Sequence, residues 1–224
     1  MLRRATVSAV LALALASFGL AQVQTKESQA AITPGKAVEL LKEGNARFVS
    51  GKTRHRDLAA DVKATAAGQY PYAAVISCMD SRAPMEIVLD QGIGDMFSLR
   101  TAGNVVDTDF LGSLEYAVKV VGVRLVAVVG HTHCGAVKGA IDNVDMGNLT
   151  ALLGKIGPAI AASGPGTSKD ARYVDKVAEQ NVRHSLREIR ERSQIVREAL
   201  DSGKTGIVAG MYDIDTGKVV FSAD

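Results

Sequence analysis

Short apolar runs alternate with amphipathic segments along most of the chain. The apolar runs predict buried strands at 72–77, 96–100 and 124–130. Apolar residues at helical spacing predict helices at 34–48, 84–90, 107–121 and 171–200, and more weakly at 149–162. A further helix is predicted after the polar connection that follows residue 48, and it ends by Gly68. Apolar strands separated by helices are typical of α/β proteins. We therefore predict a mostly parallel central β-sheet flanked by helices.

Capping and turn residues set several of the predicted boundaries. Thr33 followed by Pro34 is typical of an N-cap and a first helical position. Gly203 follows the long segment 171–200 and is expected to end that helix. The tail from 205 to 221 predicts two strands that turn at Asp215-Thr216-Gly217.

The first 21 residues do not follow this pattern. Arg3 and Arg4 precede an apolar stretch that is short for a bilayer, and small residues surround Ala21. We predict a signal peptide at 1–21, a flexible lead-in at 22–32 and a single domain at 33–224. A retained membrane anchor and a twin-arginine signal are the alternatives. Cleavage would make the mature protein periplasmic or secreted, with no stable insertion in the membrane.

Composition argues against a nucleic-acid partner. The 224 residues carry 26 basic and 24 acidic side chains, whereas nucleic-acid binding needs a concentrated basic patch. Tryptophan is absent and aromatic residues make up only 4% of the chain, so platforms for base stacking are not expected.

The only two cysteines each follow the end of a predicted strand. Cys78 comes after 72–77, and His131 and Cys134 come after 124–130. Ligand sites of parallel sheets form at the carboxyl ends of the strands. If these strands are neighbours, roughly 5 Å apart, two thiolates and one imidazole converge, and this ligand set suits Zn²⁺. Water or Asp80 would take the fourth position. A disulfide is the alternative in an oxidising compartment.

Asp80 and Arg82 follow Cys78 at a spacing of two. In an extended chain both side chains point the same way, and arginine can bind a carboxylate through two hydrogen bonds. A carboxylate held beside a metal can accept a hydrogen bond from metal-bound water. The alternative is an ordinary surface ion pair.

These motifs resemble the β-class carbonic anhydrases from about Ala31 to the end of the chain. The resemblance rests on C-x-D-x-R and H-x-x-C together with ISCMDSR, RTAGN from Arg100, GSLEYAV and GHTHCGAV. It implies a carbonate dehydratase, a zinc lyase that reversibly hydrates CO₂ to bicarbonate and a proton. It also implies that zinc is bound by Cys78, His131 and Cys134, and that an Asp80–Arg82 dyad orients zinc-bound hydroxide.

The resemblance implies further features. In some family members the aspartate that matches Asp80 binds zinc in a closed resting form. Substrate-binding positions match Gln69, contributed by a neighbouring subunit, and Phe97, Ala102 and Gly135. The family fold has N-terminal helices that pack on a partner subunit, in a homodimer or homotetramer.

Some features leave alternatives open. Thr101 and His133 depart from the family pattern, and no tryptophan is available for a regulatory bicarbonate pocket. His133 is either a proton shuttle or a bystander, and Arg100 either acts in the site or satisfies backbone carbonyls. A hydrolase of carbonyl sulfide or carbon disulfide would use the same ligands. A non-catalytic zinc- or anion-binding relative is the third alternative.

Overall fold

The computed structural model describes residues 23–223, so the predicted signal peptide lies outside the described part of the chain. Five strands form one sheet in the order β2-β1-β3-β4-β5. The first four are parallel to their neighbours and β5 is antiparallel to β4. The strands are β1 (Ala73–Ser77), β2 (Met96–Arg100), β3 (Leu125–His131), β4 (Gly206–Tyr212) and β5 (Val219–Ala223).

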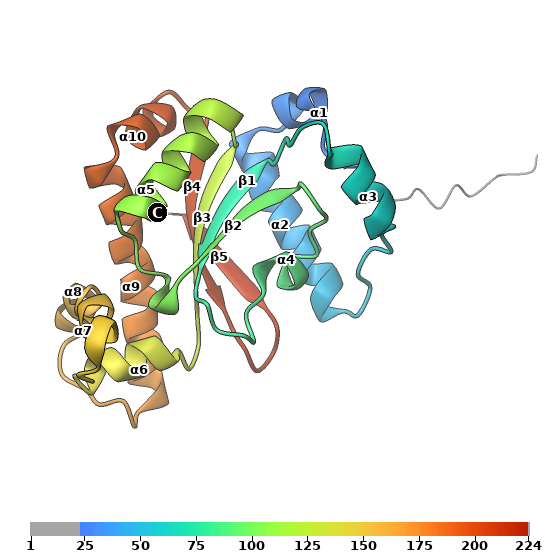
Figure 1. Ribbon diagram of the computed structural model, residues 1–224. Helices are drawn as coiled ribbons and strands as arrows, with labels where there is room; N and C mark the ends of the chain where they lie inside the picture. Colours follow the sequence, from blue (N-terminus) through green and yellow to red (C-terminus); the bar gives the residue numbers. More distant parts are fainter. Residues whose placement is uncertain (1–22, 224) are drawn as a thin grey trace, which may run out of the picture.

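Helices cover both faces of this sheet (Figure 1). On one face lie α2 (Pro34–Val49) and α4 (Met85–Val88), and on the other α5 (Thr108–Glu115), α9 (Ala171–Arg192) and α10 (Gln194–Asp201). The remaining helices are α1 (Lys26–Ala31), α3 (Leu58–Thr65), the 3₁₀ turn η1 (Ala102–Asn104), the π-helical turn η2 (Tyr116–Val121), α6 (Gly135–Ile141), α7 (Gly147–Gly154) and α8 (Gly157–Ser163). The predicted α/β fold is confirmed.

Alternate residues of the central strands supply the two cores. In β1, Ala74 and Ile76 pack toward α9 and α10, whereas Ala73 and Val75 pack toward α2 and α4. Every residue of β1 and β3 is buried, which is why these strands read as unbroken apolar runs.

The predicted long helix at 171–200 is two helices, and Ser193 separates them. Ser193 has an extended backbone, and its hydroxyl oxygen accepts from the Val196 N–H as the N-cap of α10. The same hydroxyl donates to a carboxylate oxygen of Glu115 on α5, 2.7 Å away. A serine that bonds in this way ends one helix and begins another. The weak helix predicted at 149–162 is likewise divided into α7 and α8, and Pro158 lies at the start of α8.

The N-terminal segment differs from the predicted flexible lead-in. Lys26–Ala31 forms α1, which begins with a capping box between Thr25 and Ser28. The buried Gln29 amide donates to the Pro71 carbonyl at 2.7 Å and so fixes α1 to the body of the protein. Both α1 and α2 pack on their own chain, and packing of N-terminal helices on a partner stays a prediction. None of the helices within 23–223 is long and apolar enough to cross a membrane.

Candidate metal centre at the strand tips

Cys78, His131 and Cys134 meet at the carboxyl ends of β1 and β3. These strands are parallel neighbours, with Ser77 beside Val129, so Cys78 directly follows β1 and His131 is the last residue of β3. Cys134 is the N-cap residue of α6. The two sulfurs and one imidazole nitrogen all lie within 4.8 Å of one another, and all three residues are buried. The predicted convergence is thus present, and this group could hold a metal ion.

The imidazole of His131 is oriented for a metal. Its Nδ1–H donates to the Thr132 carbonyl oxygen at 2.8 Å, which leaves a lone pair on Nε2. Nε2 is buried and has no hydrogen-bond partner among the described residues. A buried nitrogen without a partner is costly, and metal-binding histidines typically donate their other N–H in this way. One nitrogen and two sulfurs are the donors that zinc prefers.

The two thiols are not joined. Their sulfurs lie 4.0 Å apart and both cysteines are free, so the alternative of a disulfide is not the arrangement in this structure. Hydrogen bonding from Cys134 lowers the pKa of Cys78, and the Gly103 N–H lowers it further. The neighbouring Cys78 sulfur and burial raise the pKa of Cys134. Without a metal, the pair therefore favours one thiolate, at Cys78.

Asp80 lies beside this group and is held by Arg82. Arg82 donates from Nε to Asp80 Oδ1 at 2.9 Å and from Nη2 to Oδ2 at 2.7 Å, and its backbone N–H also donates to Oδ1. These bonds hold the pKa of the Asp80 carboxyl well below its usual range. Asp80 Oδ2 is 3.8 Å from His131 Nε2. The predicted pair exists, and it places an ionised carboxylate next to the candidate ligands.

Arg100 fixes the backbone of the loop that carries Cys78 and Asp80. Its Nε donates to the Cys78 carbonyl at 3.1 Å and its Nη2 to the Asp80 carbonyl at 2.6 Å. The role that the sequence offered for Arg100, satisfying carbonyls near the site, is the one that the structure shows.

His133 is fixed in a left-handed backbone conformation, with φ of 56°. Its N–H donates to Asp175 Oδ1 at 2.8 Å, and its Nε2 lies 3.1 Å from Asp215 Oδ2 in the turn before β5. Asp175 was not among the residues singled out from the sequence, because nothing in the α9 pattern links it to a loop 42 residues earlier.

The predicted substrate-binding positions do not all gather in one place. Ala102 and Gly135 adjoin the candidate ligands through Gly103 and Cys134. Gln69 is exposed in the loop after α3. Phe97 lines a hollow of about 570 Å³ beside the edge strand β2, together with Tyr116 and residues of α5. The substrate-binding roles of these four residues stay predictions.

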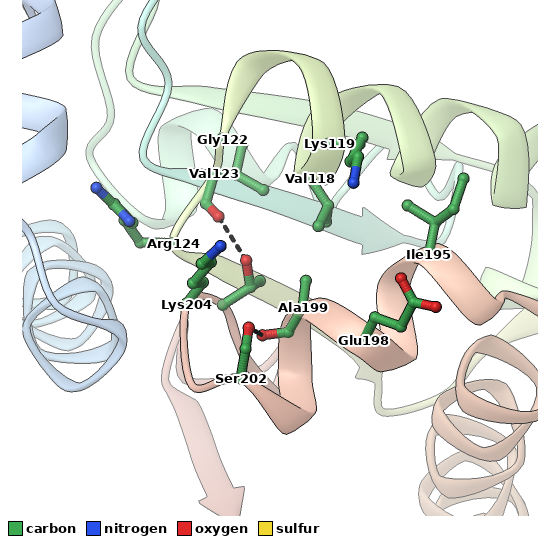
Figure 2. A pocket seen from close by; sticks show the side chains of 11 residues that line it. Val118, Lys119, Gly122, Val123, Arg124, Ile195, Glu198, Ala199, Ser202 and Lys204 are labelled. Atoms are coloured by element: carbon green, nitrogen blue, oxygen red, sulfur yellow. Dashed lines mark hydrogen bonds between the residues drawn. The ribbon is translucent and has the colours of Figure 1, made fainter.

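A second cavity, of about 400 Å³, lies at the amino ends of β3 and β4, opposite the candidate metal centre (Figure 2). Thr205 and Val123 precede β4 and β3, and the Thr205 hydroxyl donates to the Val123 carbonyl at 2.9 Å. The Ser202 hydroxyl donates to Ala199 O at 3.0 Å. These two hydroxyls therefore already bond within the fold. None of the predicted site residues lines this cavity.

Comparisons with known proteins agree with the site. Residues 73–219 match the family model described as carbonic anhydrase. Carbonic anhydrase 2 of Mycobacterium tuberculosis is 38% identical over 193 residues, which cover 84% of this chain and 92% of the relative. The carbonic anhydrase of Pseudomonas aeruginosa is 31% identical over 167 residues, covering 70% of this chain and 76% of the relative.

Solved structures extend the agreement to the fold. The β-carbonic anhydrase CafA of Aspergillus fumigatus superposes with a TM-score of 0.67 at 26% identity, covering 84% of this chain and 89% of that one. A tetrameric β-carbonic anhydrase of Sordaria macrospora superposes with a TM-score of 0.64 at 25% identity, covering 71% of this chain and 84% of that one. The family match includes β1 to β4 and all three candidate ligands. The chain therefore belongs to the β-carbonic anhydrase family, and it is a carbonic anhydrase.

Proposed function

We propose that this enzyme uses zinc, held by Cys78, His131 and Cys134, to hydrate CO₂ reversibly to bicarbonate and a proton. The observation that carries the proposal is the His131 imidazole: one of its nitrogens lies within 4.8 Å of two free thiols, and its buried Nε2 has no hydrogen-bond partner among the described residues. Bound zinc supplies Lewis acidity that lowers the pKa of water and yields a nucleophile at neutral pH.

Asp80 and Arg82 orient the reaction in this proposal. The Asp80 carboxylate is ionised and can only accept hydrogen bonds, so it fixes the direction in which a neighbouring O–H points. Arg82 binds both carboxylate oxygens and keeps Asp80 from turning toward the sulfurs. This arrangement supports an open form with a free coordination position, rather than one closed by Asp80.

The test joins metal content to rate. We expect one zinc per chain, CO₂ hydration in stopped flow that disappears when a chelator removes the metal, and recovery when zinc is restored. Cys134→Ala should lose both zinc and rate. A metal-free preparation with full activity would contradict the proposal. Assaying carbonyl sulfide and carbon disulfide on the same protein tests the alternative substrates, because hydrolysis of either as fast as CO₂ hydration would favour them.

We also propose that the chain forms a homodimer or homotetramer. Leu58 and Val62 on α3 are each 56% exposed, and β2 is an edge strand of the sheet. Exposed apolar side chains and an open strand edge each favour association. The Sordaria relative is tetrameric. A partner's Gln69 could then enter the site. Light scattering on wild type and on Leu58→Glu tests this proposal, since a monomeric wild type would contradict it.

Export of the mature protein is likewise a proposal, based on the N-terminal 21 residues. Fractionation of cells that express the full chain, with N-terminal sequencing of the product, tests it. The expected product begins near residue 22 and lies outside the cytoplasm.

A further inference from the structure

Two buried polar residues, Asn181 and Ser185, interrupt the apolar face of α9. Asn181 lies among Val177, Ala178 and Val182, and 0% of its surface is exposed. A buried amide is unfavourable unless it is hydrogen-bonded, so its partners indicate what it does.

Its partner is the turn η1. Asn181 Nδ2 donates to the Gly103 carbonyl at 2.6 Å, and one helical turn further along α9 the Ser185 hydroxyl donates to the Asn104 carbonyl at 3.0 Å. Two consecutive carbonyls of η1 are thus held by side chains of a single helix.

This turn needs external support. Gly103 and Asn104 both have left-handed backbones, with φ of 66° and 46°. The left-handed backbone favours glycine at 103, and a Cβ there would lie 2.8 Å from Ile156 Cδ1, so the Ile156 side chain would have to shift. The side-chain nitrogen of Asn104 does not stabilise this turn, because the buried Nδ2 has no hydrogen-bond partner in the described structure. The bonds from α9 therefore stabilise a conformation that is locally unfavourable.

The conformation of η1 matters because it determines where the Gly103 N–H points. The Gly103 N–H donates to Cys78 Sγ at 3.3 Å. A hydrogen bond to a thiolate withdraws electron density from sulfur, and such bonds tune the metal that the sulfur binds. Turning the η1 peptides would move this N–H away from the sulfur.

We propose that Asn181 is a positioning residue for the metal centre: it holds η1 so that the Gly103 N–H donates to Cys78 and weakens that thiolate as an electron donor. The inference rests on the proposed metal site. Asn181 touches neither substrate nor the candidate ligands, and it acts through Gly103.

The test uses cobalt(II) in place of zinc, because sulfur-to-cobalt charge transfer reports the electron density on the thiolate. In Asn181→Leu the band is expected at lower energy than in wild type, with a roughly 10-fold lower kcat/KM for CO₂ hydration in the zinc form. Asn181→Ala, whose smaller side chain leaves room for a water, should shift the band less. Ile189→Ala is the matched control, since Ile189 is equally buried on α9 but packs in the core toward the sheet.

The outcomes separate the two proposals. Absence of bound cobalt in wild type would contradict the metal site itself. Bound cobalt with the same band in wild type and both Asn181 variants would overturn the role of Asn181 alone. So would an equal shift in Ile189→Ala.

Wild type gives a second measurement that does not depend on a variant folding. In protein loaded with cadmium-113, magnetisation transfer between the metal and the Gly103 amide proton is expected across the hydrogen bond to Cys78. Its absence would overturn the inference.

Discussion

Asp80 and Asp90 are both held by hydrogen bonds from arginine side chains, and they differ in where the arginines come from. Asp80 pairs with Arg82, two residues further on. Asp90 pairs with Arg47 and Arg56, which are 43 and 34 residues away in the sequence. The side chain of Asp90 is 2% exposed, whereas that of Asp80 is 15% exposed and that of its partner Arg82 is 55% exposed.

The ion pairs of Asp90, called the distant pair below, connect separate elements of the fold. Asp90 follows α4, and its carboxylate accepts from Arg47 on α2 and from Arg56 Nη1 in the next loop, at 2.6 Å. Arg56 also donates to the Asp90 carbonyl. The local pair joins nothing distant, and instead holds a carboxylate 3.8 Å from His131. Ion pairing with arginine thus connects separate elements of the fold at Asp90, and it positions a carboxylate in the candidate site at Asp80.

The largest effect is expected from a substitution that breaks the local pair of Asp80 and Arg82. Asp80→Asn removes the acceptor-only carboxylate and presents an amide that can donate as well as accept. We expect kcat/KM for CO₂ hydration to fall about 100-fold or more, as when a positioned polar group that acts in the transition state is lost. Stopped-flow hydration of CO₂ measures this loss.

The free energy of unfolding should change by less than about 1 kcal/mol in Asp80→Asn, because an ion pair with an exposed partner contributes little. Zinc content should stay at the wild-type level. Wild-type activity in Asp80→Asn would place this aspartate outside the mechanism.

The same substitution at Asp90 should have the opposite result. Asp90→Asn keeps a side chain that tolerates the left-handed backbone, with φ of 48°, but leaves two guanidinium groups without their counter-ion. We expect a loss of about 2–3 kcal/mol of unfolding free energy, less than for a fully buried pair because Arg47 is partly exposed. Denaturant unfolding measures it.

Activity per folded molecule should remain at the wild-type level in Asp90→Asn. A normal midpoint of unfolding with a large loss of rate would reverse the roles that we assign to the two aspartates.

The sequence allowed much of the local arrangement to be predicted. Cys78, Asp80, Arg82, His131 and Cys134 lie within two short segments that follow strands, so spacing and strand order bring them together. The cluster at Asp90 could not be predicted in this way. Its three charged residues come from separate elements, and their spacing has no period that links them.

The hydrogen bonds from α9 to the loops around the candidate site could not be predicted from the sequence either. Asn181 and Asp175 act through single hydrogen bonds to loops 78 and 42 residues earlier, and a helical pattern does not indicate such partners. The break at Ser193 within 171–200 was also not predicted, because the Ser193 hydroxyl that caps α10 donates to Glu115, which is far away in sequence. Predictions from periodicity succeed where the partner is the core and fail where the partner is one distant polar atom.

A smaller effect is expected from Arg82→Lys, which tests whether the two-bond geometry of the Asp80–Arg82 pair matters in addition to its charge. Arg82→Lys keeps the charge but replaces a planar fork with a point charge, so only one oxygen of Asp80 can be held well. We expect kcat/KM to fall about 10-fold, with stability and zinc content unchanged. Arg82→Ala, assayed beside it, should lose more rate. Equal rates in wild type and Arg82→Lys would show that charge alone orients Asp80.

The smallest effect is the response of the distant pair to acid. Burial by itself would raise the pKa of the Asp90 carboxyl, but hydrogen bonds from Arg56 and Arg47 outweigh it, and the pKa in the folded protein is lowered. A carboxyl whose pKa is lower in the folded than in the unfolded state stabilises the fold above the unfolded pKa, about 3.9 for aspartate. This contribution is lost as the pH falls through the folded pKa.

The difference in unfolding free energy between wild type and Asp90→Asn should therefore be constant from pH 7 to about 5 and narrow below about 4. Urea unfolding of both proteins across this range measures the difference. Half-exposed Arg82 makes the Asp80 pair easy for salt to screen, so added salt should change the stability gap of Asp80→Asn more than that of Asp90→Asn. A gap at Asp90 that widens in acid would mean that the pKa of Asp90 is raised rather than lowered in the folded protein, and would contradict the stabilising ion pairs that we assign to it.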